Sequence, residues 1–219
     1  MGRRALPKFD PATDLSRHFR TVEQLCAAPW DPAAWFGRTA PLEVEVGSGK
    51  GLFVQNASLG APERDFLGIE LAFRYARHTA SRLAKRSIPN AIAVHGDALR
   101  LFRELIPAAS LAAVHVYFPD PWWKSRHHKR RVMNEGFLAD VVRTLQTGGR
   151  LHFWTDVKEY YDGSLELIAQ HTPLAGPLEV PERPAAHDLD FRTHFERRTR
   201  LHEEPVYRAE FVKRGEERG

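Results

Sequence analysis

Three predicted strands, each with an acidic residue at or near its carboxyl end, constrain this sequence more than any other feature. The segments are Leu42–Val46, which contains Glu45, Asp65–Glu70 and Asn90–Asp97. Strands that alternate with helical segments favour an α/β fold with a mostly parallel, doubly wound sheet and helices on both faces. The carboxyl ends of parallel strands meet at one edge of such a sheet, where ligands bind. We therefore expect the three acids to line a ligand site.

A glycine-rich turn, Gly47-Ser-Gly-Lys-Gly51, follows the first of these strands and precedes an apolar helical segment. This order is typical of nucleotide-binding α/β units, because glycine lets the backbone turn tightly and approach a ligand closely. The spacing of Gly47, Gly49 and Gly51 matches neither the dinucleotide pattern nor a phosphate loop, so the turn alone is a weak signal. Glu70 follows 19 residues after Gly51. An acid about there binds ribose hydroxyls in nucleotide-like cofactors, and capping of the next helix is the alternative.

Glu45 indicates the kind of ligand. The first strand of a doubly wound sheet is central and covered on both sides. A carboxylate at its carboxyl end therefore needs a partner, and a cationic ligand would supply one. For Glu43, two residues earlier, an ordinary place on a solvated face is a fair alternative.

The segment from Ala112 to Arg131 combines three chemistries. An apolar strand, Ala112–Phe118, ends at Pro119-Asp120-Pro121, where two prolines stiffen the backbone and remove donors from any further ladder. Two tryptophans and a basic run follow, with the members Trp122, Trp123, Lys124, Arg126, His127, His128, Lys129, Arg130 and Arg131. An acceptor for a base edge, aromatic faces for stacking and cations for phosphates are the groups that bind RNA. For the basic run alone, a solvated loop or a localisation signal is the alternative.

Length and charge fit one domain with a polyanionic partner. The 219 residues suit one α/β domain, residues 39–219, after a basic arm, residues 1–38, with a short helix near Val22–Ala27 and Trp30 and Trp35 packed on the core. The net charge of +4 and pI of about 9.4 come from several arginine clusters and favour nucleic acid, without choosing RNA or DNA.

Composition also sets expectations about location and metals. The single cysteine, Cys26, excludes an internal disulfide and a thiolate-rich zinc site, and we expect no metal. No apolar run reaches the length of a membrane span, and the N-terminal residues lack the apolar stretch of a secretory signal. We expect a cytoplasmic protein without a membrane partner.

The second half of the domain continues the alternation. Asn134 is expected to cap a helix that ends at Gly148-Gly149. A strand, Leu151–Thr155, leads to Asp156, for which capping of a helix around Tyr160–Gln170 is the alternative. The Pro-rich residues 171–190 suggest an irregular loop with a short strand. Thr193 to Glu196 has the spacing of a capping box, and Val206–Val212 is a last strand.

With these motifs identified, the chain resembles the bacterial single-subunit tRNA (guanine-N7)-methyltransferase family. The matching segments run from Glu45-Val-Gly-Ser-Gly-Lys-Gly51, through Gly68-Ile-Glu70, Gly96-Asp97, Phe118-Pro-Asp-Pro-Trp122 with its basic run, and Thr155-Asp156, to Thr193-His-Phe-Glu196. They cover nearly the whole chain beyond the arm. The glycine turn is common to many methyltransferases, whereas the Pro-Asp-Pro-Trp segment and the late Thr-x-Phe-Glu are much more specific.

The resemblance implies a Rossmann-like class I methyltransferase fold of about seven strands, with S-adenosylmethionine as cofactor and the variable-loop guanine (position 46) of tRNA as target. It implies a cofactor site made of Glu45, Gly47, Gly49, Gly51, Glu70, Asp97 and Asp120. It implies substrate contacts from Lys124, Asp156, Thr193, His194, Phe195 and Glu196. Arg126, Lys129, Arg130 and Arg131 would hold RNA phosphates, and Trp123 has no implied role. The oligomeric state, monomer or homodimer, stays open.

The implied chemistry needs alignment more than proton transfer. Guanine N7 exposes a lone pair, so no proton must leave before it attacks the methyl carbon. Asp120, the implied catalytic residue, or Asp156 can accept from the guanine N1–H and amino group and support the positive charge that the ring gains.

Two other functions stay open from the residues. One is a methyltransferase for an exocyclic amine of a nucleic-acid base, because Pro-Asp-Pro-Trp loosely resembles the Asn/Asp-Pro-Pro-aromatic turn of such enzymes. The other is a noncatalytic RNA-binding protein on the same scaffold.

Overall fold

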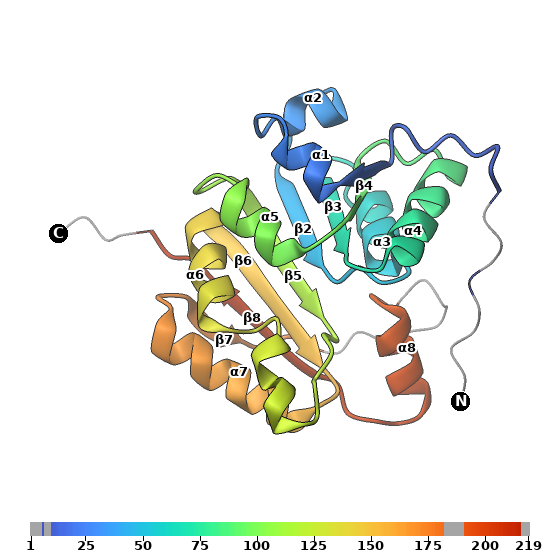
Figure 1. Cartoon of the computed structure of the whole chain (residues 1–219). Coiled ribbons are helices and arrows are strands. Elements are labelled where there is room, and N and C mark those ends of the chain that lie inside the picture. Colours follow the sequence, from blue (N-terminus) through green and yellow to red (C-terminus); the bar gives the residue numbers. More distant parts are fainter. Residues whose placement is uncertain (1–5, 7–9, 182–190, 216–219) are drawn as a thin grey trace.

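Over the residues that the structure describes, the fold is a single eight-stranded sheet with helices on both faces. The computed structural model describes residue 6, residues 10–181 and residues 191–215, so the start of the predicted arm and residues 182–190 lie outside the described residues. The sheet order is β1-β4-β3-β2-β5-β6-β8-β7, and all neighbouring pairs are parallel except those that β8 makes with β6 and β7. Figure 1 shows α5, α6 and α7 on one side of the sheet and α3 and α4 on the other.

The described elements follow one another in the order expected of an α/β chain. They are β1 (Phe19–Thr21), α1 (Val22–Cys26), α2 (Pro32–Phe36), β2 (Leu42–Val46), α3 (Leu52–Gly60), β3 (Asp65–Glu70), α4 (Phe73–Lys85), β4 (Ala91–His95), α5 (Ala98–Glu104), β5 (Leu111–Tyr117), the 3₁₀ helix η1 (Ser125–Arg130), α6 (Glu135–Thr144), β6 (Leu145–Thr155), α7 (Lys158–His171), β7 (Ala175–Leu178), α8 (His194–Leu201) and β8 (Tyr207–Val212).

Two apolar cores pack against the two faces of the sheet. The larger core joins Val44 and Val94 of the strands to Phe102 of α5, Phe137 of α6 and Ile168 of α7, all fully buried. The second core lies under α3 and α4, with members that include Phe53, Val54, Phe66, Leu83, Tyr117, Phe118 and Trp154. Because both faces are covered, nearly every residue of β2, β3 and β5 is buried, including the two glutamates of β2.

The predicted arm contributes to the domain. Its helix α1 begins at the capping box made by Thr21 and Gln24, close to the predicted position. Trp30 and Trp35 make an edge-to-face pair and pack against the larger core, which confirms their structural role. The strand β1, which pairs in parallel with β4, was not predicted and raises the expected seven strands to eight.

The prediction that Gly148-Gly149 ends a helix is wrong. The helix α6 is capped by Asn134, as predicted, but it ends at Thr144, and β6 begins at the next residue. The pairing of β5 with β6 shifts its register at this point. Gly149 is needed there because a side chain would meet the backbone oxygen of Gln146 at 2.8 Å.

None of the helices in the described ranges is long and apolar enough to cross a membrane. The same part of the chain holds no group of His, Cys, Asp or Glu side chains arranged to bind a metal ion.

Candidate functional site

The strand order places the predicted acids at one edge of the sheet. It runs outward in opposite directions from the neighbouring strands β2 and β5, and this reversal is where open α/β sheets bind ligands. Glu45 is the penultimate residue of β2 and Glu70 is the last residue of β3 at this edge, which we call the rim. Asp97 follows β4, Asp120 follows β5, and Asp156 follows β6. The parallel pairing thus gathers residues that are far apart in the sequence.

The glycine turn is shaped by two different needs. Gly47, Gly49 and Gly51 all adopt left-handed backbone conformations, with φ of 78°, 53° and 70°. A side chain on Gly47 or Gly49 would meet nothing within 4 Å, so this turn borders open space that a ligand can enter. On Gly51 it would meet the side chain of Thr79 at 2.3 Å, so this glycine lets α3 pack against α4.

Glu70 ties the glycine turn to the start of α4. Its carboxylate accepts hydrogen bonds from the backbone N–H of Gly49 and of Ala72, each at 2.8 Å. Both the ligand role and the helix-terminus alternative are compatible with this position, and the ribose contact stays a prediction. The next side chain, Leu71, is 72% exposed. An apolar residue so exposed at the rim could border a flat ligand, and the sequence offered no signal for it.

Glu45 is a buried acid with an unsatisfied oxygen. Its side chain is 3% exposed, and Oε2 has no hydrogen-bond partner among the described residues. Burial, with a smaller effect from Glu70, raises the pKa of Glu45 to about 8. A buried carboxyl with a free oxygen is costly unless a partner arrives. This is the environment that a cationic ligand would stabilise.

Three other acids differ in their surroundings. Asp97 is exposed and caps α5 by accepting from the N–H of Leu99 at 2.9 Å. Asp156 does not cap α7, because the N-cap residue is Val157. The capping alternative for Asp156 is therefore wrong, whereas its substrate contact stays a prediction. Glu43, for which a solvated face was a fair alternative, is instead buried and paired with His115 and Arg64.

The Pro119-Asp120-Pro121 segment is held between two strained residues. Phe118 and Trp122 have φ of 49° and 48°, a left-handed conformation that is rare for aromatic residues. Each such residue costs on the order of 1–3 kcal/mol and persists only where its surroundings impose it. Phe118 continues the ladder by donating to the backbone oxygen of Trp154 at 2.7 Å. The exposed Asp120 is thus presented at the rim by a rigid turn.

The basic run forms the short helix η1 and divides into exposed and inward-facing cations. Lys124, Arg126 and Lys129 are exposed, and the guanidinium of Arg130 lies over the ring of Trp122 at 5.1 Å. Arg131 faces inward instead, with 15% of its side chain exposed.

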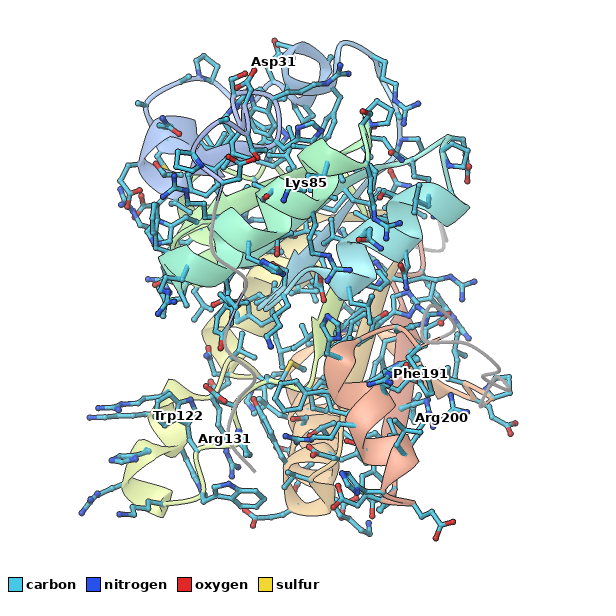
Figure 2. The ribbon with its side chains drawn as sticks, turned by 90° about the vertical axis from the view of Figure 1, so that its right-hand side faces the viewer. Asp31, Lys85, Trp122, Arg131, Phe191 and Arg200 are labelled. Atoms are coloured by element: carbon cyan, nitrogen blue, oxygen red, sulfur yellow. The ribbon has the colours of Figure 1, made fainter. Side chains whose placement is uncertain are left out.

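Arg131 anchors the segment that carries the basic run, residues 122–131, to the domain. We call this segment the basic loop. Arg131 donates to the backbone oxygen of Pro121 at 2.8 Å and lies over the ring of Tyr160 at 4.7 Å. Figure 2 shows Trp122 and Arg131 together on this loop. The predicted phosphate contact of Arg131 stays untested, but its present contacts hold the loop itself.

The segment Thr193–Glu196 begins α8. Thr193 caps the helix by accepting from the N–H of Glu196 at 3.0 Å, as predicted. Glu196 is 3% exposed, and its carboxylate accepts from the N–H of Arg192 and pairs with Arg208. Its role in the free protein is therefore structural.

The two residues between Thr193 and Glu196, His194 and Phe195, contact residues of other elements. Phe195 is 44% exposed and stacks on Phe118, with ring centroids 6.0 Å apart. His194 contacts Arg82, and burial together with Arg82 lowers the pKa of His194 to about 4. The contact of Phe195 with Phe118 brings the predicted substrate segment to the end of the strand that carries Asp120.

Comparison with known proteins identifies the family. A family model described as "Putative methyltransferase" matches residues 39–209. The tRNA (guanine-N(7)-)-methyltransferase of Rhodopirellula baltica is 50% identical over 220 residues, which cover 98% of this chain and 81% of that protein. The chain belongs to the tRNA (guanine-N(7)-)-methyltransferase family. The relative of the same name from Aromatoleum aromaticum is 39% identical over 78% of this chain and 65% of its own length.

Solved structures confirm the class of fold. The antibiotic-resistance methyltransferase Kmr superposes with a TM-score of 0.58 at 18% identity, covering 87% of this chain and 96% of that one. A SAM-dependent O-methyltransferase from Thermotoga maritima gives 0.51 at 15% identity over 82% and 62% of the two chains. At these identities the likeness concerns the fold alone. It confirms the predicted Rossmann-like, class I methyltransferase architecture.

Proposed function

We propose that this protein transfers the methyl group of S-adenosylmethionine to N7 of a guanine in tRNA, the variable-loop guanine at position 46. The observation that carries the proposal is the pairing, at one rim, of an unsatisfied buried acid, Glu45, with an exposed acid on a rigid turn, Asp120. The first suits a cationic cofactor and the second a guanine. Membership of the family supports both assignments.

The rim fits the cofactor in its charge and shape. Glu45 offers a buried oxygen to a positively charged group, and the open space above Gly47 and Gly49 admits a ligand against the backbone. Glu70 and Asp97, at the ends of neighbouring strands, would receive the ribose and base portions. When bound, S-adenosylmethionine would supply the electrophile, a methyl carbon whose bond to the positively charged sulfur breaks as the bond to N7 forms.

The protein's own part in the reaction is orientation and electrostatic support. Guanine N7 carries an exposed lone pair, so no residue needs to remove a proton before the attack. Asp120 would accept from the N1–H and amino group of guanine, which aims N7 at the methyl group. The same carboxylate would stabilise the positive charge that the ring acquires in the transition state. Because the turn is already rigid, little reorganisation is needed when substrate arrives.

Two surfaces would hold the tRNA around the guanine. The exposed cations Lys124, Arg126, Lys129 and Arg130 on η1 suit phosphates, and the 71% exposed Trp123 beside them offers a face for stacking. On the other side of the target, the segment Thr193 to Glu196 would contact the substrate from the start of α8. Since the partner would be tRNA, we expect the protein to act in the cytoplasm, as a monomer or homodimer.

Nucleoside analysis tests the proposal. The protein is incubated with labelled S-adenosylmethionine and unmodified tRNA, and the RNA is then digested to nucleosides and analysed by mass spectrometry. We expect label in 7-methylguanosine, and none when the variable-loop guanine of the transcript is replaced by adenine. Label on an exocyclic nitrogen would overturn the N7 assignment, and tRNA binding without methyl transfer would indicate a noncatalytic RNA-binding protein.

A further inference from the structure

A chain of hydrogen bonds runs from β2 through β5 to the segment that begins α8. Arg192 donates from a guanidinium nitrogen to the hydroxyl of Tyr117 at 3.0 Å. This hydroxyl lies 2.9 Å from Nδ1 of His115, and Nε2 of His115 lies 2.7 Å from the carboxylate of Glu43. Arg64 closes the far end by donating to the other oxygen of Glu43. His115 and Tyr117 are 3% and 5% exposed, so the two middle bonds are buried, whereas the bonds made by Arg192 and Arg64 at the ends are part-buried.

Burial and charge favour one direction for each bond in this chain. Burial lowers the pKa of His115, so its ring is neutral at neutral pH and has one N–H. Glu43 can only accept, because His115 and Arg64 together lower its pKa despite the burial that opposes them. The proton of His115 is therefore on Nε2, and Nδ1 accepts from the hydroxyl of Tyr117. That hydroxyl is left to accept from Arg192, which can only donate.

Arg192 connects this chain to α8. Its backbone N–H donates to the buried carboxylate of Glu196 at 2.6 Å, and its guanidinium lies over the ring of Trp154 at 5.0 Å. The residue before it, Phe191, is buried, with the guanidinium of Arg200 over its ring, and Figure 2 shows these two side chains together at α8. Arg192 thus joins the first turn of α8 to β5 and β6 through directional contacts.

We propose that Tyr117 and Arg192 are positioning residues that fix the substrate segment Thr193–Glu196 relative to Asp120. The inference rests on the proposed function. Tyr117 is the last residue of β5, and the rigid turn with Asp120 follows directly. The hydrogen bond from Arg192 therefore joins the two parts that would hold guanine from opposite sides. A purely apolar contact would attach α8 but would leave it free to slide, whereas a fully paired polar chain specifies one arrangement.

A double-mutant cycle tests this role. The variants are Tyr117→Phe, Arg192→Met and the double variant, because both substitutions keep an apolar side chain in place and both remove the hydrogen bond between Arg192 and Tyr117. Phenylalanine also removes the hydroxyl that bonds His115, and methionine also removes the charge over the Trp154 ring, so each single variant carries one further change of its own. Single-turnover methylation is measured with saturating cofactor and tRNA. We expect each single variant to slow the reaction about tenfold, as misplacement of a bound reactant does. We expect the double variant to be no slower than the slower single variant, because both changes break the same hydrogen bond.

Further measurements separate positioning from loss of structure. Affinity for S-adenosylmethionine should stay within about twofold of wild type in all three variants, and Arg192→Lys should recover part of the rate, because lysine can still donate to Tyr117. The matched control is Tyr161→Phe on α7. It removes a tyrosine hydroxyl that donates to the backbone oxygen of Arg208 in β8 at 3.0 Å. Its rate should match wild type.

Three results would overturn the inference. Slowing that multiplies in the double variant would mean independent roles for the two residues, and wild-type rates in Arg192→Met would exclude the link. If Tyr117→Phe does not fold, the rate of Arg192→Met decides alone whether the link matters, because the side chain of Arg192 is only half-buried. A wild-type protein that forms no 7-methylguanosine contradicts the proposed function instead. The same variants are then compared in tRNA titrations, where unchanged affinity would overturn the positioning role.

Discussion

The rim has a cofactor half, made by Glu45, the glycine turn 47–51 and Glu70, and a substrate half, made by Asp120, the basic run and the start of α8. These two halves are built by different means. In the cofactor half the backbone sets the geometry. Gly47 and Ser48 donate their N–H groups to the oxygen of Ile69, and the N–H of Gly49 reaches the carboxylate of Glu70. In the substrate half, side chains hold the parts in place. Arg131 fastens the basic loop through Pro121 and Tyr160, and Arg192 fastens α8 through Tyr117.

This difference predicts how each half should respond to change. A site made from backbone N–H groups and left-handed glycines is formed as soon as the sheet folds, so its variants should alter cofactor affinity. A site assembled by long side chains depends on each of those contacts. Its variants should alter turnover or RNA binding while the cofactor affinity stays the same.

The largest effect is expected from Asp120→Asn, which keeps the shape of the turn but removes the charge. Turnover should fall on the order of 100-fold, as it does when other preorganised electrostatic groups are removed, and tRNA affinity should hardly change, because phosphate contacts dominate it. Single-turnover methylation measures the first and a tRNA titration the second. Asp162→Asn, at an exposed acid paired with Lys158 on α7, is the control and should match wild type. A wild-type rate in Asp120→Asn would leave the residue as part of a structural turn.

The next effect tests the cofactor half. Glu70→Ala should weaken S-adenosylmethionine binding by about 1–3 kcal/mol, or roughly 5- to 150-fold in Kd, because a charged acceptor is removed. Calorimetric titration measures it, with Glu104→Ala as the control, since that acid is exposed and pairs with Arg100 on α5. An unchanged Kd would reduce Glu70 to its hydrogen bonds with Gly49 and Ala72.

The cofactor half was predictable from the sequence because it follows from chain order. Short β-branched and apolar segments alternate with helical segments, glycines mark the turn, and parallel pairing places Glu45 and Glu70 at one edge. The strand β1 was missed because it has only three residues, Phe19–Thr21, too few to show any periodicity. Gly148-Gly149 was misassigned because a glycine pair marks a helix end and a strand irregularity equally well.

The substrate half was predictable in content but not in arrangement. The residues that supply acceptors, aromatic rings and cations are visible in the sequence. Their tertiary contacts are not. Nothing local shows that Arg131 turns inward, that Glu43 pairs with His115, or that Phe118 and Trp122 adopt left-handed conformations. Those features depend on side chains that meet across the fold, such as Tyr160 beneath Arg131.

A smaller effect should follow from the pH dependence of cofactor binding. Glu45 in the free protein has a pKa of about 8, raised by burial from an ordinary value of 4.5. A cationic ligand favours the ionised form, so affinity should rise with pH, at most about tenfold per unit, and level off above about pH 8.

The same shift affects stability in the opposite direction. Without ligand, the folded protein holds a proton that the unfolded chain releases, so the contribution of Glu45 to stability is complete below pH 4.5 and is lost as pH rises towards 8.

Calorimetry in two buffers of different ionisation enthalpy should detect proton release when cofactor binds at pH 7. In Glu45→Gln the release should vanish, and equal release in both proteins would contradict the assignment.

The smallest effect contrasts two parts of the basic loop. Lys129→Gln with Arg130→Gln should weaken tRNA binding and lower the slope of log Kd against log salt by about 0.7–0.9 for each phosphate that the loop no longer neutralises. Arg131→Gln should instead lower the melting temperature with a smaller change of slope, because Arg131 holds the loop. Equal slopes in the double variant and wild type would place the RNA elsewhere.

The most direct test replaces the reacting atom itself. A tRNA transcript that carries 7-deazaguanosine at the variable-loop position keeps the base-pairing edge and the phosphates but has carbon and hydrogen in place of N7. We expect this RNA to bind with wild-type affinity and to accept no methyl group, whereas the matched guanosine transcript is methylated in the same assay. Methyl transfer to the deaza transcript would contradict N7 as the nucleophile and would direct the search to the exocyclic amine.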